Sequence, residues 1–377
     1  MAETLHLSGI IRNVRYLPQF HSKTLKRFDL ASFDINLSDA SCVVRYDEEY
    51  MIGLSKWVSP KRTRSFPFSR IYGTYHLPKI VTVIPIIKDE GYEGDNDRIN
   101  FMTLSWMNLM DVYIILAWYD DAVAHPDARN KITNQRLNNS YVVEKLHEIR
   151  LNRKSAMHWN EMHFENDFES VYRRAVGRYQ QLGARLGCKM HSESRHLNTL
   201  AKYLENGEFS LDGFASQTLP RSYSAAKRET LTRHKLERLT DGNNAHLAIQ
   251  NRLGGTYHLT ADEIFHEDGQ LVIQESKNTK SKGLPTIGNI QDGLFKCILH
   301  SNIDELKLGE TAFKFSTRLK LTGKFQGSLI LPVVDKSELE LFLKVNQFGS
   351  ADVSKIRLLN REANMNPGLS IHIAGYQ

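Results

Sequence analysis

Two kinds of hydrophobic pattern divide the chain. Up to about residue 121, short apolar runs such as VVRYDEEYMIGLSKWV and KIVTVIPIIKDE are rich in β-branched and aromatic residues, which favours strands. From about residue 130 to 203, apolar residues recur three and four positions apart, as in FESVYRRAVGRYQQLGARLG, which indicates helices. Gly, Ser, Asp and Pro then interrupt any period, so we expect a domain boundary near residue 215.

The second half of the chain predicts a mixture of strands and helices. An Asp268–Gly269 pair between two apolar runs is a strong hairpin signal. The expected elements, in order, are a helix with a break at Asp241–Gly242 (224–255), two strands joined by the hairpin (256–265 and 270–278), a helix (286–303), two strands (311–323 and 327–334) and a helix (336–347). We therefore expect an α+β region over 1–215 and a mixed α/β domain over 216–377.

Composition indicates a globular protein. The chain has 377 residues, of which 41% are hydrophobic and 24% are charged, and this mix suits about two domains. No apolar run reaches the roughly 18 residues of a membrane helix, and no signal peptide is visible. Three widely spaced cysteines (Cys42, Cys188 and Cys297) exclude a disulfide framework and a four-cysteine zinc site, and they suit a reducing cytoplasm. The net charge of +6 permits a polyanion such as DNA as a partner.

One group of residues carries recognisable chemistry. Glu275 and Lys277 lie two positions apart on a predicted strand, so they share a face. The hairpin returns the preceding strand, with Asp262 on it, to their side. Two carboxylates suit Mg²⁺, which binds one or two protein carboxylates together with phosphate and water oxygens. An acidic residue and a lysine directly after the apolar Val272 and Ile273 are costly unless they are paired or used.

These residues resemble the PD-(D/E)XK nuclease superfamily, and the string QESKNTKSKGLPTIGNIQDGLFKCILHSN resembles type II restriction endonucleases. The resemblance covers roughly residues 225–335, and it departs from the signature at Ala261, where the signature has a Pro that many members lack. It implies a central mixed sheet flanked by helices, with Asp262 and Glu275 as ligands of Mg²⁺ or Mn²⁺. It also implies catalytic roles for Lys277 and for Gln291 at the start of the following helix.

The resemblance implies a site-specific endonuclease of double-stranded DNA, with residues 216–377 as the nuclease core and residues 1–215 as the DNA-recognition region. It also implies a homodimer in the cytoplasm, with a DNA methyltransferase as genetic partner. A repair, transposon or phage nuclease of the same fold remains an alternative. So does a non-catalytic DNA-binding protein on a decayed nuclease fold, although the intact Asp262, Glu275 and Lys277 disfavour decay. A third acidic ligand from the preceding helix, Glu237, is a further alternative.

Basic side chains mark candidate DNA contacts, because contacts to phosphates supply affinity that does not depend on sequence. One group combines Lys227, Arg228 and Arg233 on the predicted helix with Lys280 and Lys282 after the second strand of the hairpin. Solvated helix faces carry similar charges.

A second group, Arg62 and Arg64, lies between aromatic residues in KWVSPKRTRSFPFSR and could contact bases. An exposed loop anchored by its aromatic residues explains this segment equally well.

Two rival sites are weaker. HWNEMH lacks the spacing of a zinc protease motif. The acidic segment DEGYEGDNDR, which begins at Asp89, lacks a following (D/E)-x-K strand, and a solvated turn explains it better. At the main site, we expect that removing Asp262 or Glu275 relieves repulsion between like charges and leaves stability unchanged or slightly higher.

Overall fold

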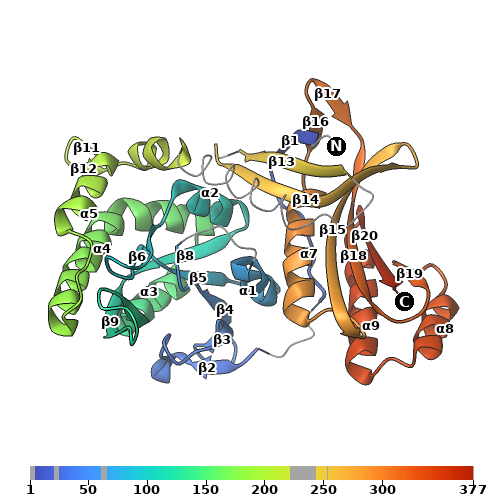
Figure 1. The fold of residues 1–377 in the computed structure, drawn as a ribbon, viewed down its shortest axis with the longest axis horizontal. Coiled ribbons are helices and arrows are strands. Elements are labelled where there is room, and N and C mark those ends of the chain that lie inside the picture. Colours follow the sequence, from blue (N-terminus) through green and yellow to red (C-terminus); the bar gives the residue numbers. More distant parts are fainter. Residues whose placement is uncertain (1–4, 21–24, 61–65, 221–242, 253, 377) are drawn as a thin grey trace. The chain divides into compact units, whose positions relative to one another are not determined.

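The computed structural model describes residues 5–20, 25–60, 66–220, 243–252 and 254–376 (Figure 1). The chain forms two compact units, each described by itself below. The C-terminal unit comprises Met1–Thr24, Phe68–His76 and Ala226–Gln377, and the N-terminal unit comprises Leu25–Pro67 and Leu77–Ala225. This division differs from a single boundary near residue 215, because two early segments pack with the C-terminal unit.

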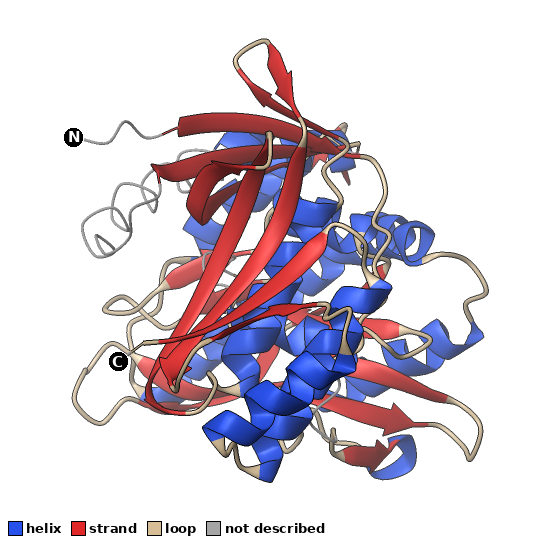
Figure 2. Cartoon of the chain, turned by 90° about the vertical axis from the view of Figure 1, so that its right-hand side faces the viewer, coloured by secondary structure: helices blue, strands red, loops and turns tan. Residues whose placement is uncertain are grey.

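The C-terminal unit is built on a nine-stranded mixed sheet, which agrees with the expected α/β class. Figure 2 looks onto the twisted face of this sheet. Its strands, in spatial order, are β17 (Thr311–Phe313), β16 (Glu305–Leu308), β1 (Leu5–Ile11), β13 (Asn243–Asn251), β14 (Thr256–Glu267), β15 (Gln270–Lys282), β18 (Phe315–Lys324), β20 (Leu369–Gly375) and β19 (Ser328–Leu331).

The β14–β15 hairpin forms as the sequence predicts. Asp268 and Gly269 have φ angles of 49° and 77°, the left-handed pair that a tight hairpin turn requires. Gly adopts this conformation without strain, and Asp is one of the few other residues that tolerate it. Val272 and Ile273 are buried on β15. The hairpin therefore places the two candidate carboxylate strands side by side.

Helix α7 (Ile287–Ser301) follows the hairpin, and β16 and β17 lie between it and β18, which runs parallel to β15. Thr286 caps α7 by accepting a hydrogen bond from the Asn289 N–H. Leu294 and Ile298 are fully buried along its apolar face, and the helix packs against β15 and β18. Helices α8 (Lys336–Asn346) and α9 (Ser350–Met365) follow and pack against β19, and α9 also packs against β20.

The helix expected over 224–255 is wrong where the structure describes it. Residues Asn243–Asn251 form strand β13, which pairs in parallel with β1 and antiparallel with β14. Leu247 and Ile249 are buried two positions apart, the period of a strand. Pairing with β1 from the N-terminal end of the chain and with the adjacent β14 decides this segment. The remainder of the expected helix lies mostly outside the described residues.

The N-terminal unit contains a five-stranded sheet in the order β2 (Arg27–Asp29), β3 (Ser41–Arg45), β4 (Met51–Lys56), β5 (Ile80–Pro85) and β8 (Val112–Ala117). Helices α3 (Asn139–Leu151), α4 (Ala156–Leu186) and α5 (Glu193–Leu200) confirm the predicted helical segment from residue 139 onwards, whereas residues Ile132–Leu137 at its start form a strand. Helix α2 (Phe101–Leu109) interrupts the strand-rich segment. The remaining elements are α1 (Phe66–Thr74), which lies mostly in the C-terminal unit, and β6 (Ile87–Asp89), β7 (Asn96–Arg98), β9 (Tyr119–Ala124), β10 (Ile132–Leu137), β11 (Leu204–Glu205) and β12 (Glu208–Phe209).

Side chains of α4 form hydrogen bonds with the backbone of β8, a strand at the edge of the five-stranded sheet. The Ile114 N–H donates to Asn160 Oδ1 over 2.7 Å, and the Leu116 N–H donates to His163 Nε2 over 3.0 Å. Trp159 Nε1 donates to the Ile114 carbonyl oxygen over 2.9 Å. The HWNEMH segment therefore covers a strand edge, which would otherwise expose unpaired backbone groups.

The structure bears on two expectations from composition, which concern membrane helices and the cysteines. Across the described part of the chain, no helix has both the length and the apolar character to cross a membrane. Cys42, Cys188 and Cys297 are buried and free of disulfides.

Candidate active site

The candidate carboxylates meet where two paired strands separate. The ladder between β14 and β15 ends at Glu263 and Gln274, and the residues that would pair next are Asp262 and Glu275. From that point β14 continues along β13, and β15 continues along β18. The Ser276 N–H donates to Asp262 Oδ2 over 2.8 Å. The side chain of Asp262 thus binds the backbone of the departing strand.

Glu275 is completely buried and has an asymmetric environment. Its Oε1 accepts hydrogen bonds from Lys277 Nζ over 3.0 Å and from Lys296 Nζ. Its Oε2 has no hydrogen-bond partner among the described residues. An unpartnered carboxylate oxygen at full burial is unfavourable unless a ligand approaches it. Glu275 therefore presents one satisfied and one unsatisfied oxygen.

Lys277 lies between two acidic side chains. Its Nζ donates to Glu275 Oε1 and, over 2.7 Å, to Asp292 Oδ2 on α7. Close packing of α7 on the sheet makes this contact possible, because Gly293 has no side chain there. A Cβ at Gly293 would lie 2.7 Å from Leu319 Cδ1 and 3.3 Å from Lys277 Cε.

Helix α7 contributes a row of polar side chains that sequence reasoning missed. Asp292, Lys296 and His300 are four residues apart and buried, so they share one face of the helix. His300 has no hydrogen-bond partner on either ring nitrogen within the described structure. The signal in the sequence is this polar row within an otherwise apolar helix.

Gln291, the residue expected from the resemblance, precedes Asp292 by one position and points about 100° away around the helix. Within the described structure, no hydrogen bond or ion pair joins it to the cluster, and its role stays a prediction. Asp292 is the residue from the start of α7 that binds Lys277.

The two carboxylates differ in their electrostatics. Burial, followed by the negative charge of Glu275, raises the pKa of Asp262 to about 6. Burial also acts to raise the pKa of Glu275, but the charges of Lys296 and Lys277 outweigh it and lower the pKa to about 2. Burial lowers the pKa of Lys277, but Glu275 and Asp292 outweigh that effect and raise it. At neutral pH, Glu275 and Lys277 are therefore firmly ionised.

This asymmetry corrects the expectation about stability. Asp262 fits it, because its charge is unfavourable in the folded protein. Glu275 does not, because its charge compensates two mostly buried lysines, and its removal would leave Lys296 without its carboxylate. The sequence does not predict this charge balance, because Lys296 lies 21 positions from Glu275.

The cluster fits a hard divalent cation in its donor set. The unpartnered Oε2 of Glu275 and the carboxylate of Asp262 are oxygen donors, and burial followed by the charge of Glu275 raises the pKa of Asp262. No group of three or more His, Cys, Asp or Glu side chains within the described ranges is placed to hold a metal ion. The site thus offers two carboxylates, with the remaining ligands left to water and phosphate, as Mg²⁺ commonly accepts.

The candidate DNA contacts divide into two sets. Lys280 and Lys282 are exposed on the last part of β15, beyond Lys277. The other named side chains lie outside the described residues: Arg62, Arg64, Lys227, Arg228, Arg233 and the alternative ligand Glu237.

The acidic segment that begins at Asp89 contains an exposed turn at Tyr92 and Glu93, as the sequence favours, but its first residue is buried. Asp89 is completely buried and accepts hydrogen bonds from the rings of His191 (2.8 Å) and His196 (3.0 Å) and from the Gly91 N–H (2.9 Å). Arg98 contacts the other ring nitrogen of His196 at 3.2 Å. Each carboxylate oxygen already has a ring partner, which is the pattern of a structural network.

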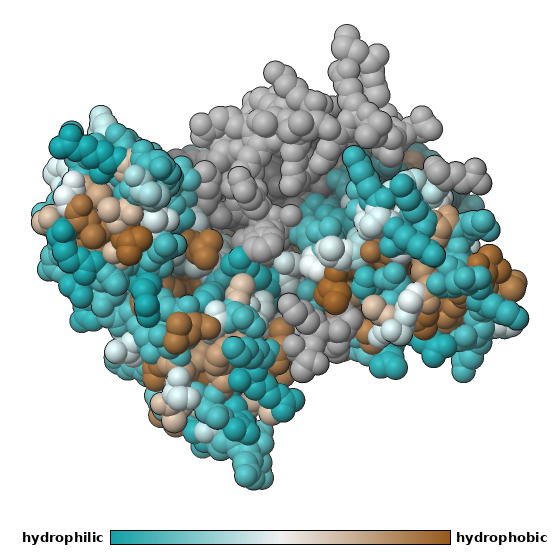
Figure 3. Space-filling model, turned by 60° about the horizontal axis from the view of Figure 1, so that its bottom comes forward, coloured by the Kyte–Doolittle hydropathy of each residue, from teal (hydrophilic) through white to brown (hydrophobic). Residues whose placement is uncertain are grey.

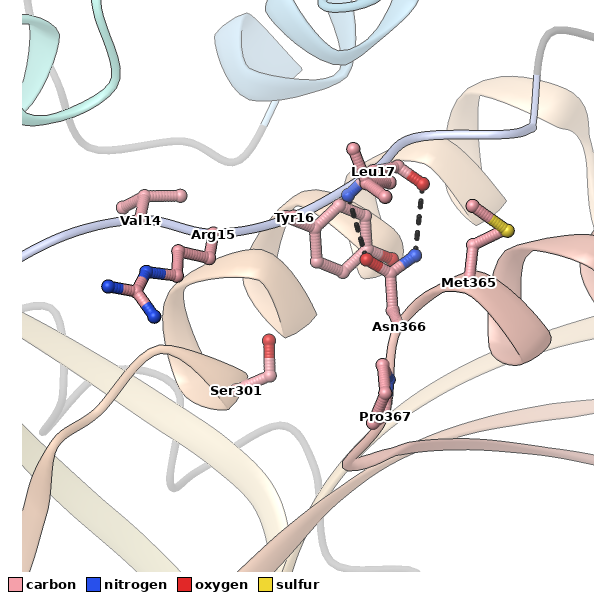
Figure 4. Close-up of a pocket in the computed structure, with 8 residues that line it drawn as sticks. All are labelled: Val14, Arg15, Tyr16, Leu17, Ser301, Met365, Asn366 and Pro367. Atoms are coloured by element: carbon pink, nitrogen blue, oxygen red, sulfur yellow. Dashed lines mark hydrogen bonds between the residues drawn. The ribbon is translucent and has the colours of Figure 1, made fainter.

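A separate pocket of about 500 Å³ lies at the far end of α7 (Figure 4). Its wall includes Arg15 and Leu17, and Asn366 binds the Leu17 backbone through both N–H (2.8 Å) and carbonyl (3.0 Å). The C-terminal residues of α7 and α9, Ser301 and Met365, also line it. Helix C-terminal ends carry partial negative charge, which suits the Arg15 cation and disfavours a phosphate.

No family model, curated protein or solved structure matches this chain. The functional interpretation therefore comes from the side chains at the point where β14 and β15 separate, here called the strand fork, and from those of α7.

Proposed function

We propose that the chain is a Mg²⁺-dependent endonuclease of double-stranded DNA, of the type II restriction type. The observation that carries this proposal is the fork between β14 and β15, with Asp262 and Glu275 at the point of separation. Lys277 lies two residues further along the same face and contacts Glu275. The order β13, β14, β15 and α7, followed after β16 and β17 by β18 parallel to β15, supports the nuclease core that the resemblance implies.

Each side chain has a defined task in this proposal. Asp262 and the Oε2 of Glu275 would hold Mg²⁺, which when bound lowers the pKa of a water molecule and stabilises charge on the phosphate. Lys277 uses two N–H donors on Glu275 and Asp292, and its third is available for a phosphate oxygen or the attacking water. The burial of the cluster strengthens these charge interactions.

The partners follow from the proposed activity. Double-stranded DNA would lie along basic side chains, of which Lys280 and Lys282 are the described pair. A homodimer would cut both strands of a palindromic site, because protein symmetry then matches DNA symmetry. A DNA methyltransferase would protect the host DNA in the cytoplasm.

A plasmid digest tests the proposal. With Mg²⁺ or Mn²⁺, the protein should convert supercoiled plasmid into discrete linear fragments, and chelator should abolish the reaction. Ca²⁺ should support DNA binding without cleavage, because it accepts the same oxygens in a looser geometry. A smear would instead indicate a nonspecific nuclease of the same fold.

Substitutions localise the activity. Asp262→Asn, Glu275→Gln and Lys277→Met should each reduce cleavage at least a hundredfold, whereas Glu340→Gln on the exposed surface of α8 should leave it unchanged. Cleavage by Glu275→Gln at the wild-type rate, or full activity in chelator, would refute the site.

A further inference from the structure

Lys296 is a buried cation that no sequence motif marks. It lies in the middle of α7, with 7% of its side chain exposed, and its ammonium group contacts Glu275 Oε1. This is the same oxygen that Lys277 binds, whereas Oε2 has no described partner. The two lysines therefore hold one edge of the carboxylate and leave the other edge open.

The spacing of α7 matches the spacing of β15. Glu275 and Lys277 are two residues apart on one face of the strand, and Asp292 and Lys296 are four residues apart on one face of the helix. Their charges alternate across the contact: Asp292 binds Lys277, Lys277 binds Glu275, and Glu275 binds Lys296. A shift of either element by one residue would break all three contacts.

The charge balance of this network matters for a cation. Asp262, Glu275 and Asp292 supply three carboxylates against the ammonium groups of Lys277 and Lys296, so one negative charge is in excess when all are ionised. Lys296 thus lowers the negative charge that a divalent cation would meet at the fork. It also fixes which oxygen of Glu275 stays free.

We propose that Lys296 is a positioning residue: it is the internal counter-cation of Glu275, directs Oε2 toward a divalent cation, and limits how tightly that cation binds. This inference rests on the proposed metal site. The role differs from that of Lys277, which is more exposed, at 17%, and has a donor available for substrate.

Lys296→Met tests the role, because it keeps the length of the side chain and removes the charge. Titration calorimetry with Mg²⁺, without DNA, should show at least threefold tighter binding than wild type, since a competing positive charge is gone. The single-turnover cleavage rate at saturating Mg²⁺ should nevertheless fall at least tenfold, because Glu275 is no longer held. Lys296→Arg should restore both values to within about twofold of wild type.

Lys355→Met is the matched control. Lys355 is a helical lysine on α9 with 14% of its side chain exposed, and its carboxylate partner is Asp352. Its substitution should leave Mg²⁺ affinity and cleavage rate unchanged.

Melting curves in chelator provide a readout that is independent of activity. Lys296→Met should melt at a lower temperature than wild type, because Glu275 loses a charge partner. The melting temperature of the double variant Lys296→Met with Glu275→Gln should fall by less than the sum of the decreases in the two single variants.

The possible failures can be told apart. An unchanged Mg²⁺ affinity and cleavage rate in a folded Lys296→Met variant would overturn the inference and leave the metal site standing. Wild-type protein that binds no divalent cation would overturn the proposed function and this inference with it.

Discussion

At the scale of single residues, Asp262 and Glu275 are neighbours with the same charge whose pKa values shift in opposite directions. Burial and the charge of Glu275 raise the pKa of Asp262 to about 6, while two lysines lower that of Glu275 to about 2. Folding therefore favours the protonated form of Asp262 and the ionised form of Glu275. Replacing each carboxylate with its neutral amide should consequently have opposite effects on stability at the two positions.

Asp262→Asn should raise the melting temperature at pH 8 and leave it unchanged at pH 4. The loss of stability that the charge of Asp262 causes is small near the ordinary pKa of 3.8. It grows as the pH rises to about 6 and persists above that pH. A gain of about 1 kcal/mol corresponds to roughly 2–4 °C for a unit of this size. Glu275→Gln should instead lower stability at pH 7, on the order of 3 kcal/mol, because it breaks a buried ion pair.

The stabilising effect of Glu275 should fade in acid. It is fully present above pH 4.5, the ordinary pKa of this carboxyl, and disappears as the pH falls toward 2. Melting curves of wild type, Asp262→Asn and Glu275→Gln across pH 3–8 measure both effects. Equal shifts for the two variants at every pH would contradict the assigned environments.

Gly293 shows how a single missing side chain positions the cluster. In Gly293→Ala, the new Cβ would meet Leu319 and the stem of Lys277, so we expect a loss of about 1–3 kcal/mol and slower cleavage. Gly288→Ala on the same helix is the matched control, since nothing lies within 4 Å of its Cβ. That variant should gain up to about 1 kcal/mol from helix propensity, as measured by denaturant unfolding. A neutral Gly293→Ala variant would show that α7 can move away from the sheet.

At the scale of elements, α4 protects the edge of the N-terminal sheet through its side chains. Asn160→Leu should cost about 1–3 kcal/mol, because the buried Ile114 N–H loses its acceptor. Asn166→Leu, at an exposed position of the same helix, should change stability by less than about 0.5 kcal/mol. Unfolding by urea compares the two, and equal losses would contradict the role of Asn160 at the strand edge.

At the scale of the whole molecule, charge on the exposed surface should control the affinity for DNA. The double variant Lys280→Ala/Lys282→Ala should weaken binding to all sequences alike and reduce the salt dependence of log K by about two, if both contact phosphates. Lys336→Ala/Lys344→Ala removes the same charge from α8, which packs on β19, with β18 and β20 between β19 and β15. Binding assays in Ca²⁺ at several salt concentrations should show a change only in the first variant.

The exposed surface also has an apolar component. Figure 3 shows hydrophobic side chains gathered on the C-terminal unit at its right-hand side, where α8 lies. Leu341 and Val345 on α8 are 64% and 54% exposed. They do not contribute to the fork.

The first residues of the chain belong to the C-terminal unit, although the residues that follow them in the sequence belong to the N-terminal unit. The buried carboxylate of Glu362 on α9 accepts a hydrogen bond from the Phe20 N–H over 2.8 Å and one from the Tyr72 hydroxyl over 2.8 Å. Strand β1 pairs in parallel with β13. These contacts join segments that are more than two hundred residues apart in the sequence.

Local patterns in the sequence determine the parts of the candidate site that depend on few residues. The Asp268–Gly269 turn, the alternation of Glu275 and Lys277 and the amphipathic α7 follow from periods of two and 3.6 residues, and all three agree with the structure. The tertiary structure alone decides which side chains from other elements complete the site. Lys296 and Asp292 reach Glu275 and Lys277 only because α7 packs closely on β15, and β13 becomes a strand because β1 and β14 pair with it. Such contacts depend on burial and on hydrogen bonds between distant segments, which no local pattern contains.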